Sequence, residues 1–510
     1  LQEAPAALRK ELESLGFDSI RRGQVAAVIL SGGQGTRLGY SGPKGMYSIG
    51  LPSQKSIFQI HIERLDRIRV LAAELAGPTC SVPHLPVYVM TSESNNNIIQ
   101  TFFEENHYFN YPEEDVFFFE QGLLPCLTMD GKLIIQAENS LSMAPDGNGG
   151  VFPALQKSGA FQNMLTRGVR HIHLYGIDNI LTKAADPAFI GYCIKHNCDV
   201  ANKVVARANA SEKVGVSATR NGRLCIVEYS ELPESMTGVD SNGRLIYSAA
   251  NICNHYFSVS FLKNKVFAGS NSLYHLAHKK IPYYDPTTKK TITPDANNGI
   301  KLEMFVFDVF PLADRWKIME VNRDDEFAPV KNAPGSATDS PDTARALLSH
   351  QSMRWLQAAG ANIVAAAGMP SDSRGDADCE ISPLISYAGE GLSSFNGVRV
   401  LLPVYITERQ VRQSMIESED HLLDVVRAHR PPEKPMKYGT AGFRDEWTKL
   451  HAIFVRMGMM AALRSRSSGG KCTGVMITAS HNPEKDNGIK IVDTDGGMLA
   501  QEWEPLAEEI

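Results

Sequence analysis

The 510-residue chain lacks the features that mark several protein classes. No apolar run approaches the roughly 20 residues needed to span a bilayer, and the first ten residues do not resemble a secretory signal peptide. The eight cysteines are scattered without a paired pattern, which suits reduced thiols. The formal charge of −6 gives no support to a nucleic-acid surface. We therefore expect a cytoplasmic protein with neither membrane nor nucleic-acid partners, and its oligomeric state is left open.

What the chain does contain is a glycine-rich segment that follows an apolar run. Residues 25–30 are apolar and predict a buried strand. Four glycines follow within eight residues, and they allow the backbone to turn sharply and approach a ligand without Cβ clashes. Main-chain N–H groups in such a turn can hold phosphate oxygens, while Arg37 and Lys44 add positive charge. An ordinary strand-to-helix turn is the alternative.

Two common phosphate-binding motifs do not fit this segment. No Gly-Lys-Ser/Thr follows the glycines, so a nucleoside triphosphatase is not expected. Leu38 stands where the dinucleotide-binding motif requires its third glycine.

The remainder of the first 400 residues alternates strand and helix patterns, which predicts a mostly parallel, covered sheet. Strands are expected at residues 85–91, 116–120 and 171–177, and an amphipathic helix at 56–75. Ligands in such folds bind at the carboxyl ends of strands. Asp178 follows one of these strands, where its carboxylate could hold Mg²⁺ or cap a helix.

Composition changes along the chain predict five parts. They are an N-terminal helical segment (1–24), a large α/β domain (25–378), a small β-rich domain (379–407), a charged helix with a proline-rich linker (408–436) and a part of different character (437–510). Residues 305–308 and 401–404 are each expected to form a strand.

The glycine segment and the motifs after it resemble those of sugar-nucleotide pyrophosphorylases, most closely eukaryotic UDP-N-acetylhexosamine pyrophosphorylases, over about residues 1–407. The resemblance implies an α/β fold with a Rossmann-like, glycosyltransferase-A-like mixed sheet and a small β-rich closing domain. It also implies Mg²⁺ as cofactor, UTP and GlcNAc-1-phosphate as substrates, and UDP-GlcNAc and pyrophosphate as products.

The same resemblance assigns roles to individual residues. Such a reaction joins two anions, so the protein must chiefly position them and neutralise their charge. The expected catalytic residues are Arg37, Lys44 and Lys331. The expected nucleotide-binding residues are Leu30, Ser31, Gly32, Gly33, Lys44, Gln121, Gly147, Asp178, Lys301 and Lys331, with Asp178 also at the metal. The expected sugar-binding residues are Asn148, Glu228, Tyr229 and Asn251.

Each of these residues also has a plainer interpretation. Lone lysines and glutamines are usually solvated, and Glu228 and Asn251 could simply lie on a strand surface. Of the two later lysines, Lys331 lies in the more distinctive sequence and is the stronger candidate.

A second signature occupies residues 438–444, 478–483 and 486–490. It resembles the opening of α-D-phosphohexomutases, most closely phosphoacetylglucosamine mutases, which convert GlcNAc-6-phosphate to GlcNAc-1-phosphate. The resemblance implies part of an α/β domain in which Ser480 carries a phosphoryl group and contacts a metal. His481 would act as acid or base and Arg444 would hold phosphate. The metal loop and phosphate-binding domain of that family do not occur before Ile510, so we expect either a bifunctional enzyme that continues further or an adaptor.

Two alternatives to a UDP-GlcNAc pyrophosphorylase remain open. One is a catalytically weak scaffold that binds sugar nucleotides, and the other is a UDP-glucose-type pyrophosphorylase. The sequence also does not decide between GlcNAc and GalNAc phosphates, or whether intermediates pass between the two parts.

Overall fold

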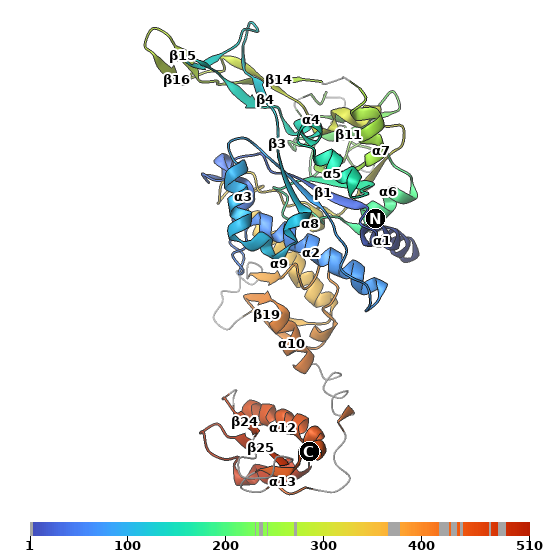
Figure 1. Ribbon diagram of the computed structural model, residues 1–510, viewed down its shortest axis with the longest axis vertical. Coiled ribbons are helices and arrows are strands. Elements are labelled where there is room, and N and C mark those ends of the chain that lie inside the picture. Colours follow the sequence, from blue (N-terminus) through green and yellow to red (C-terminus); the bar gives the residue numbers. More distant parts are fainter. Residues whose placement is uncertain are drawn as a thin grey trace. The chain divides into compact units, whose positions relative to one another are not determined.

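The computed structural model (Figure 1) describes eleven stretches of the chain. They are residues 4–229, 231–233, 238–241, 243–269, 273–365, 378–417, 428–429, 436–438, 442–468, 471–477 and 486–509. The chain forms two compact units, which are described separately. The first contains Leu1–Leu392 and Arg399–Glu408, and the second contains Ser393–Val398 and Arg409–Ile510.

A nine-stranded mixed sheet forms the centre of the first unit, in the order β12-β11-β13-β9-β1-β2-β3, with β10 beside β13 and β18 beside β10. The strands are β1 Val25–Leu30, β2 Val87–Thr91, β3 Val116–Glu120, β9 His171–Gly176, β10 Val200–Ala206, β11 Val216–Arg220, β12 Arg223–Val227, β13 Ala249–Ser258 and β18 Trp316–Glu320. The predicted strands at 25–30, 85–91, 116–120 and 171–177 are confirmed, as is the α/β fold class with a mixed sheet.

The expectation of a mostly parallel sheet holds for only part of it. Strands β3, β2, β1 and β9 run parallel, whereas β13 runs antiparallel to β9, β10 and β11. Strands β11 and β12 are joined by the two residues Asn221 and Gly222, both with positive φ. An Asn-Gly pair of this kind favours a tight hairpin between antiparallel strands. It is the sequence feature that indicates the antiparallel part of the central sheet.

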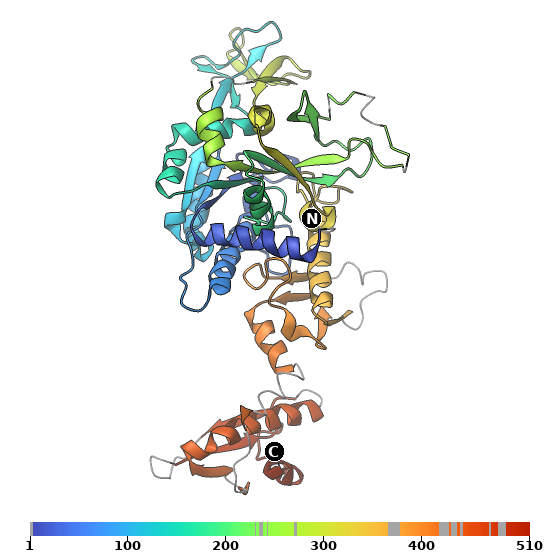
Figure 2. The same cartoon turned by 90° about the vertical axis from the view of Figure 1, so that its right-hand side faces the viewer.

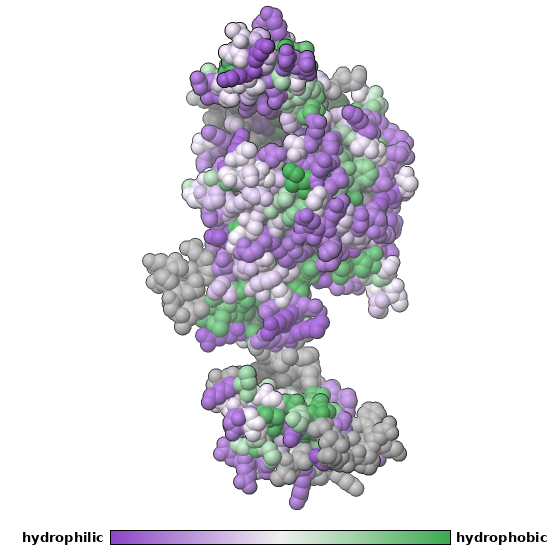
Figure 3. Space-filling view, turned by 60° about the vertical axis from the view of Figure 1, so that its left-hand side comes forward, coloured by the Kyte–Doolittle hydropathy of each residue, from purple (hydrophilic) through white to green (hydrophobic). Residues whose placement is uncertain are grey.

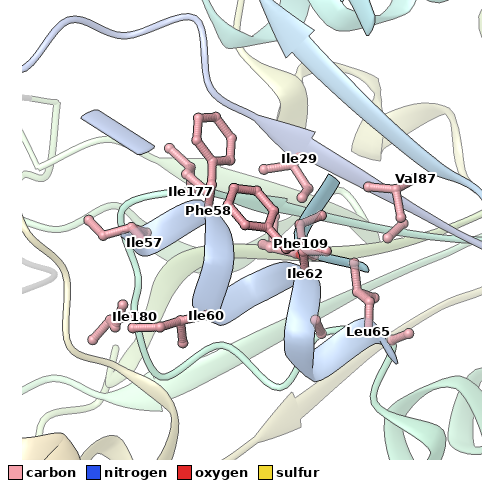
Figure 4. Close-up of a cluster of buried hydrophobic side chains, with 14 of the residues drawn as sticks. Ile29, Ile57, Phe58, Ile60, Ile62, Leu65, Val87, Phe109, Ile177 and Ile180 are labelled. Atoms are coloured by element: carbon pink, nitrogen blue, oxygen red, sulfur yellow. The ribbon is translucent and has the colours of Figure 1, made fainter. Parts of the chain in front are cut away.

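Helices cover both faces of the sheet, so β1 is buried along its whole length. Val25, Ala27 and Ile29 pack in a cluster with α2 (Ile57–Ala76), part of which is drawn in Figure 4. The alternate residues of β1 pack in a second cluster with α4 (Val151–Lys157) and α5 (Ala160–Thr166). A strand that is buried on both faces is expected to be apolar throughout, as this one is.

The predicted helix at 56–75 is confirmed as α2. It begins after Ser56, whose side chain accepts a hydrogen bond from the Gln59 N–H at 3.2 Å, and it ends at Gly77. The N-terminal helix α1 (Ala6–Arg21) packs closely on α6 (Pro187–Lys195) (Figures 1 and 2). A Cβ on Gly16 would lie 2.0 Å from the Pro187 carbonyl oxygen, so the two backbones meet directly.

Short strands extend from one end of the sheet as hairpins, at the top of Figure 1. They are β4 Leu123–Pro125, β5 Leu127–Thr128, β6 Ile135–Ala137, β7 Ser140–Leu141, β8 Met143–Pro145, β14 His275–Lys279, β15 Tyr283–Asp285, β16 Lys290–Ile292 and β17 Gly299–Glu303. Figure 3 shows hydrophilic residues over most of the visible face of this unit, with hydrophobic residues scattered among them.

The strand expected at residues 305–308 is wrong. Val306–Leu312 forms a 3₁₀-helix, η8, in which Val306, Phe307 and Phe310 are buried. The side chain of Asp308 accepts a hydrogen bond from the Phe305 N–H at 2.7 Å, and this bond fixes the first turn.

The end of the first unit contains α9 (Pro341–Ala358) and two small parallel strand pairs. The pairs are β19 Asn362–Ala365 with β21 Arg399–Leu402, and β20 Cys379–Ile381 with β22 Val404–Ile406. The single strand expected at 401–404 is divided at Pro403, which has no N–H to donate to a ladder. The finer domain boundaries expected from the sequence stay predictions.

The second unit contains the antiparallel sheet β23-β25-β24, with strands β23 Phe443–Glu446, β24 Gly474–Ile477 and β25 Asp486–Val492. It also contains the helices α12 (Trp447–Ser467) and α13 (Glu504–Glu509), the 3₁₀-helices η10 (Ser393–Phe395) and η11 (Gln501–Trp503), and all of α10 (Glu408–Glu417) after its first residue. Leu450, Met457 and Met460 of α12 pack against Ile489 and Ile491 of β25. Gly474–Ile477 pairs antiparallel with β25. No helix in the described parts of either unit combines the length and the apolar character needed to cross a membrane.

Candidate functional site

A pocket of about 510 Å³ lies where β1 and β9 end. Ten of the residues expected to bind nucleotide or sugar line it: Leu30, Gly32, Gly33, Lys44, Gln121, Gly147, Asn148, Asp178, Asn251 and Lys331. These residues come from six separate parts of the sequence, and the fold of the sheet and its loops brings them to one pocket.

The glycine segment after β1 is held by residues of the neighbouring strand and its loop. The side chain of Ser31 donates to the Met90 carbonyl oxygen at 2.8 Å, so this buried hydroxyl does not face the pocket. Asn95, which is fully buried, donates from its side chain to the carbonyl oxygen of Gly32 at 3.2 Å. A Cβ on Gly32 would lie 2.8 Å from the side-chain oxygen of Gln121. Gly32 therefore allows Gln121 to approach the turn closely.

Lys44 and Asp178 form the charged centre of the pocket. Their side chains are 18% and 26% exposed, and Lys44 Nζ lies 3.9 Å from Asp178 Oδ2. Gly45 fixes the lysine segment, because a Cβ there would lie 2.3 Å from the buried ring of Phe58 on α2. The segment can thus rest directly on the helix, and Lys44 is carried to the pocket edge.

The donor set around Asp178 fits a cation that is carried by phosphate. No cluster of three or more His, Cys, Asp or Glu side chains suited to a metal occurs among the described residues. Mg²⁺ in phosphate-handling sites commonly takes only one or two carboxylates and completes its shell with phosphate oxygens and water. A single carboxylate in the pocket, beside Lys44, matches that donor chemistry.

A buried carboxylate, Asp146, lies between Gly122 and Gly150 and was not expected from the sequence. Asp146 is only 4% exposed, and its Oδ1 has no hydrogen-bond partner within the described stretches. Burial raises the pKa of Asp146 to about 6, although the Gly122 N–H lowers it. A Cβ on Gly150 would lie 1.9 Å from Oδ1 and a Cβ on Gly122 would lie 2.5 Å from Oδ2, so these two glycines leave room for the Asp146 side chain.

The turn itself requires glycine at its first position. Gly147 has φ +87°, and a Cβ there would lie 2.4 Å from the Met304 carbonyl oxygen. Asn148 follows in the pocket wall, and its side-chain oxygen accepts from the Val306 N–H at 2.9 Å. The amide donor of Asn148 is the group left for a ligand.

Asn251 reaches the pocket from an irregularity within β13. The register between β10 and β13 shifts here, and Cys253 has φ +52° in the middle of the strand. A β-bulge re-aims side chains and is often found beside functional sites. Cys253 also lines the pocket, where burial and the Asp178 carboxylate raise the pKa of its thiol to about 12.

Five of the expected residues in the first unit do not line this pocket: Ser31, Arg37, Lys301, Glu228 and Tyr229. Arg37 is exposed on the 3₁₀-helix η1 (Thr36–Leu38), and Lys301 lies on β17. Glu228 is half-buried, and burial and the nearby Glu231 raise its pKa while His275 and Lys331 lower it. Tyr229 is 49% exposed. The roles of these five residues stay predictions.

The expected mutase residues are only partly described. Arg444 is exposed on β23. Ser480 and His481 lie outside the described residues.

A mixed α/β sheet with a glycine turn, a lysine and a carboxylate around one pocket defines a phosphate-binding α/β protein. Residues 9–370, more than half of the chain, match the family described as UTP–glucose-1-phosphate uridylyltransferase. The chain belongs to this family. Residues 450–510 match the α/β/α domain I of phosphoglucomutase/phosphomannomutase.

Individual relatives cover most of the chain. It is 45% identical over 393 residues to the UDP-N-acetylhexosamine pyrophosphorylase-like protein 1 of Xenopus tropicalis, covering 75% of this chain and 76% of that protein. It is 41% identical over 389 residues to the UDP-N-acetylglucosamine pyrophosphorylase of Saccharomyces cerevisiae, covering 75% and 78%. The crystal structure of the uridine diphosphate N-acetylglucosamine pyrophosphorylase of Trypanosoma brucei, in complex with an inhibitor, is similar with a TM-score of 0.69. It shares 34% identity, and the match covers 80% of both chains.

Proposed function

We propose that the chain is a UTP:N-acetyl-α-D-glucosamine-1-phosphate uridylyltransferase, which forms UDP-GlcNAc and pyrophosphate. The observation that carries the proposal is one pocket in which Lys44, Asp178, Lys331 and the glycine turn meet. Relatives named UDP-N-acetylglucosamine or UDP-N-acetylhexosamine pyrophosphorylase support the choice of sugar.

The pocket residues suit the reaction by binding and orienting two anions. The glycine-turn N–H groups and the ammonium groups of Lys44 and Lys331 would offset the charge of the triphosphate and of the attacking sugar phosphate. Asp178 would hold Mg²⁺, and the bound ion would supply further neutralisation of phosphate charge. Gln121 can both donate to and accept from the uracil edge.

The sugar would contact Asn148 and Asn251, which line the pocket. Glu228 and Tyr229 do not line it and remain proposed as further contacts. Amide groups suit the hydroxyl and N-acetyl groups of an amino sugar, and such contacts give orientation and selectivity.

The test is a pyrophosphate-release assay with the full chain, UTP, Mg²⁺ and either GlcNAc-1-phosphate or glucose-1-phosphate. We expect kcat/KM to be at least tenfold higher for GlcNAc-1-phosphate, in line with a pocket that contacts the added group. The reverse preference would identify a UDP-glucose-type enzyme. Tight UTP binding without turnover of either sugar phosphate would identify a scaffold.

For residues 437–510 we propose a phosphohexomutase-type domain, supported by the family match to residues 450–510. Phosphate transfer through Ser480, with His481 and Arg444 assisting, remains the corresponding proposal for its chemistry. Conversion of GlcNAc-6-phosphate to GlcNAc-1-phosphate by the full chain, lost in Ser480→Ala, would establish a second activity, and no conversion by either would leave an adaptor role. We also propose the cytoplasm as its location, which fractionation of cells can test.

A further inference from the structure

Asn179 lies directly after Asp178 and connects two segments that are distant in sequence. Its side chain is buried, with 3% of the residue exposed. The amide nitrogen donates to the Glu326 carbonyl oxygen at 2.7 Å, and the amide oxygen accepts from the Ala328 N–H at 2.8 Å. The same oxygen accepts from the Leu181 N–H at 3.3 Å. All three bonds join this side chain to main-chain groups.

The two segments also pair through their backbones on either side of Asn179. The Val330 N–H donates to the Asp178 carbonyl oxygen at 2.8 Å, and the Ile180 N–H donates to the Ala328 carbonyl oxygen at 3.2 Å. Asp178 and Lys331 therefore lie at the pocket end of a short ladder, one on each segment. A slip of this ladder would change the separation of the carboxylate and the ammonium group.

The second segment is anchored to the central sheet by a buried ion cluster. Lys203 on β10 is fully buried and donates to the side chains of both Glu326 and Asp186, the latter at 2.5 Å. Lys183 lies 3.6 Å from the other carboxylate oxygen of Glu326. A buried charge cluster with few alternative arrangements holds Glu326 at one position. The amide of Asn179 is bonded to the Glu326 carbonyl oxygen, so it holds the loop that carries Asp178 at a fixed place relative to Glu326.

We propose that Asn179 is a positioning residue for nucleotidyl transfer. Asn179 lines the pocket, but its side chain is engaged with main-chain groups, and through these bonds it sets the separation between Asp178 and Lys331. This inference rests on the proposed function, because it assumes that both groups act on the same phosphate chain. The competing interpretation is a purely structural asparagine that contributes to folding alone.

Two substitutions remove the contacts in steps. Asn179→Asp keeps an oxygen for Ala328 and Leu181 but cannot donate to the Glu326 carbonyl, whereas Asn179→Ala removes all three bonds. A displacement of about 1 Å at a reacting group can lower the rate by about 10²-fold. We expect kcat to fall by about 10²-fold in Asn179→Ala and by roughly tenfold in Asn179→Asp. Asn179 makes no bond to the glycine turn or to Gln121, the proposed contacts of the turn and the uracil, so the dissociation constant of uridine nucleotide should change by less than about threefold.

Asn254→Asp is the matched control. Asn254 on β13 is also fully buried, but its amide nitrogen has no hydrogen-bond partner in the described stretches, and its oxygen contacts only His173, at 2.7 Å. The control introduces the same buried acid without breaking a bond between the two segments. It should retain kcat within about threefold once rates are normalised to folded protein. Equal losses of kcat in Asn254→Asp and Asn179→Asp would overturn the proposal.

A second measurement does not depend on turnover. Hydrogen exchange of the full chain should show faster exchange at the Ala328 and Val330 amides in both Asn179 variants, but not in Asn254→Asp. Unchanged exchange there would overturn the inference whatever the enzyme catalyses. Absence of turnover in the unsubstituted chain would instead reject the proposed function.

Discussion

The two ends of the central sheet each contain a pocket, and the larger pocket is not the better candidate site. The pocket at the carboxyl ends of β1 and β9 has about 510 Å³. The pocket at the opposite end, beside Gln24 and His171 where these strands begin, has about 680 Å³. Both are lined by cationic side chains, so neither volume nor charge alone distinguishes them.

The difference lies in how firmly the polar groups are held. In the first pocket Lys44 and Asp178 are mostly buried, and glycines allow close approach of the backbone. In the second, Arg22, Arg170 and Lys263 are exposed, and Arg22 pairs with Asp18 at 2.7 Å. Exposed charges are screened by water and salt, so they contribute little free energy to the binding of an anion. Preorganised groups at a partly buried site contribute far more. The smaller pocket is therefore the proposed site of the phosphate chemistry.

The largest effect should come from removing the charged centre of that smaller pocket. We expect Lys44→Ala and Asp178→Asn each to lower kcat/KM by at least about 10²-fold, because both act on charge that develops during transfer. Pyrophosphate release is the measurement. Asp18→Asn in the opposite pocket is the control and should stay within twofold. If activity survives both changes at the smaller pocket, the assignment of the site is wrong.

A smaller effect should come from Asp146, the buried carboxylate between Gly122 and Gly150. The pKa of Asp146 is raised to about 6 in the folded protein, so the folded state binds this proton more tightly than the unfolded state between about pH 4 and 6. Stability should therefore fall as pH rises through that window. Asp146→Asn should remove this pH dependence and raise the free energy of unfolding by up to about 3 kcal/mol at pH 7.5.

Urea unfolding at several pH values measures this slope. Asp130→Asn serves as control, because the pKa of Asp130 is lowered to about 2 by its hydrogen bonds to Lys132 and Thr128, so its titration lies below the window. A slope that persists in Asp146→Asn would mean that another group causes it.

The bulge at Cys253 should give a still smaller effect. At φ +52° any residue with a Cβ, cysteine included, is strained by about 1–2 kcal/mol; a β-branched residue is more crowded still, and glycine is not strained. Cys253→Val should therefore lower the free energy of unfolding below that of the unsubstituted chain and raise KM for the sugar phosphate, since Asn251, two residues away, lines the pocket. Cys253→Gly should leave KM within about twofold. The same KM in both variants would show that the bulge does not orient Asn251.

The smallest effect is expected at the larger pocket. Arg22→Ala and Lys263→Ala should leave turnover within twofold and the free energy of unfolding within about 0.5 kcal/mol, because both side chains are exposed. Steady-state kinetics and urea unfolding measure both. A tenfold loss of turnover in either variant would mean that the two pockets are coupled.

Much of the architecture was predictable because its signals are local. The apolar run at 25–30, the capped helix after Ser56 and the strand before Asp178 all formed as expected. The antiparallel half of the sheet and the 3₁₀-helix after Phe305 did not follow from periodicity, since each depends on a short turn or a single capping side chain. Such features depend on turn residues and capping side chains, and the spacing of hydrophobic residues does not predict them.

The sequence by itself determined the strands, the glycine turn and the residue types that can hold phosphate, because each needs only a few neighbouring residues. Only the tertiary structure decided which of them share a pocket and which supporting residues hold them there. Asn95 contacts the glycine segment from 63 residues away, and Asn179 contacts Glu326 from 147 residues away. Hydrogen bonds between segments so distant in the chain are set by how the sheet brings strand ends together, and no local pattern records them.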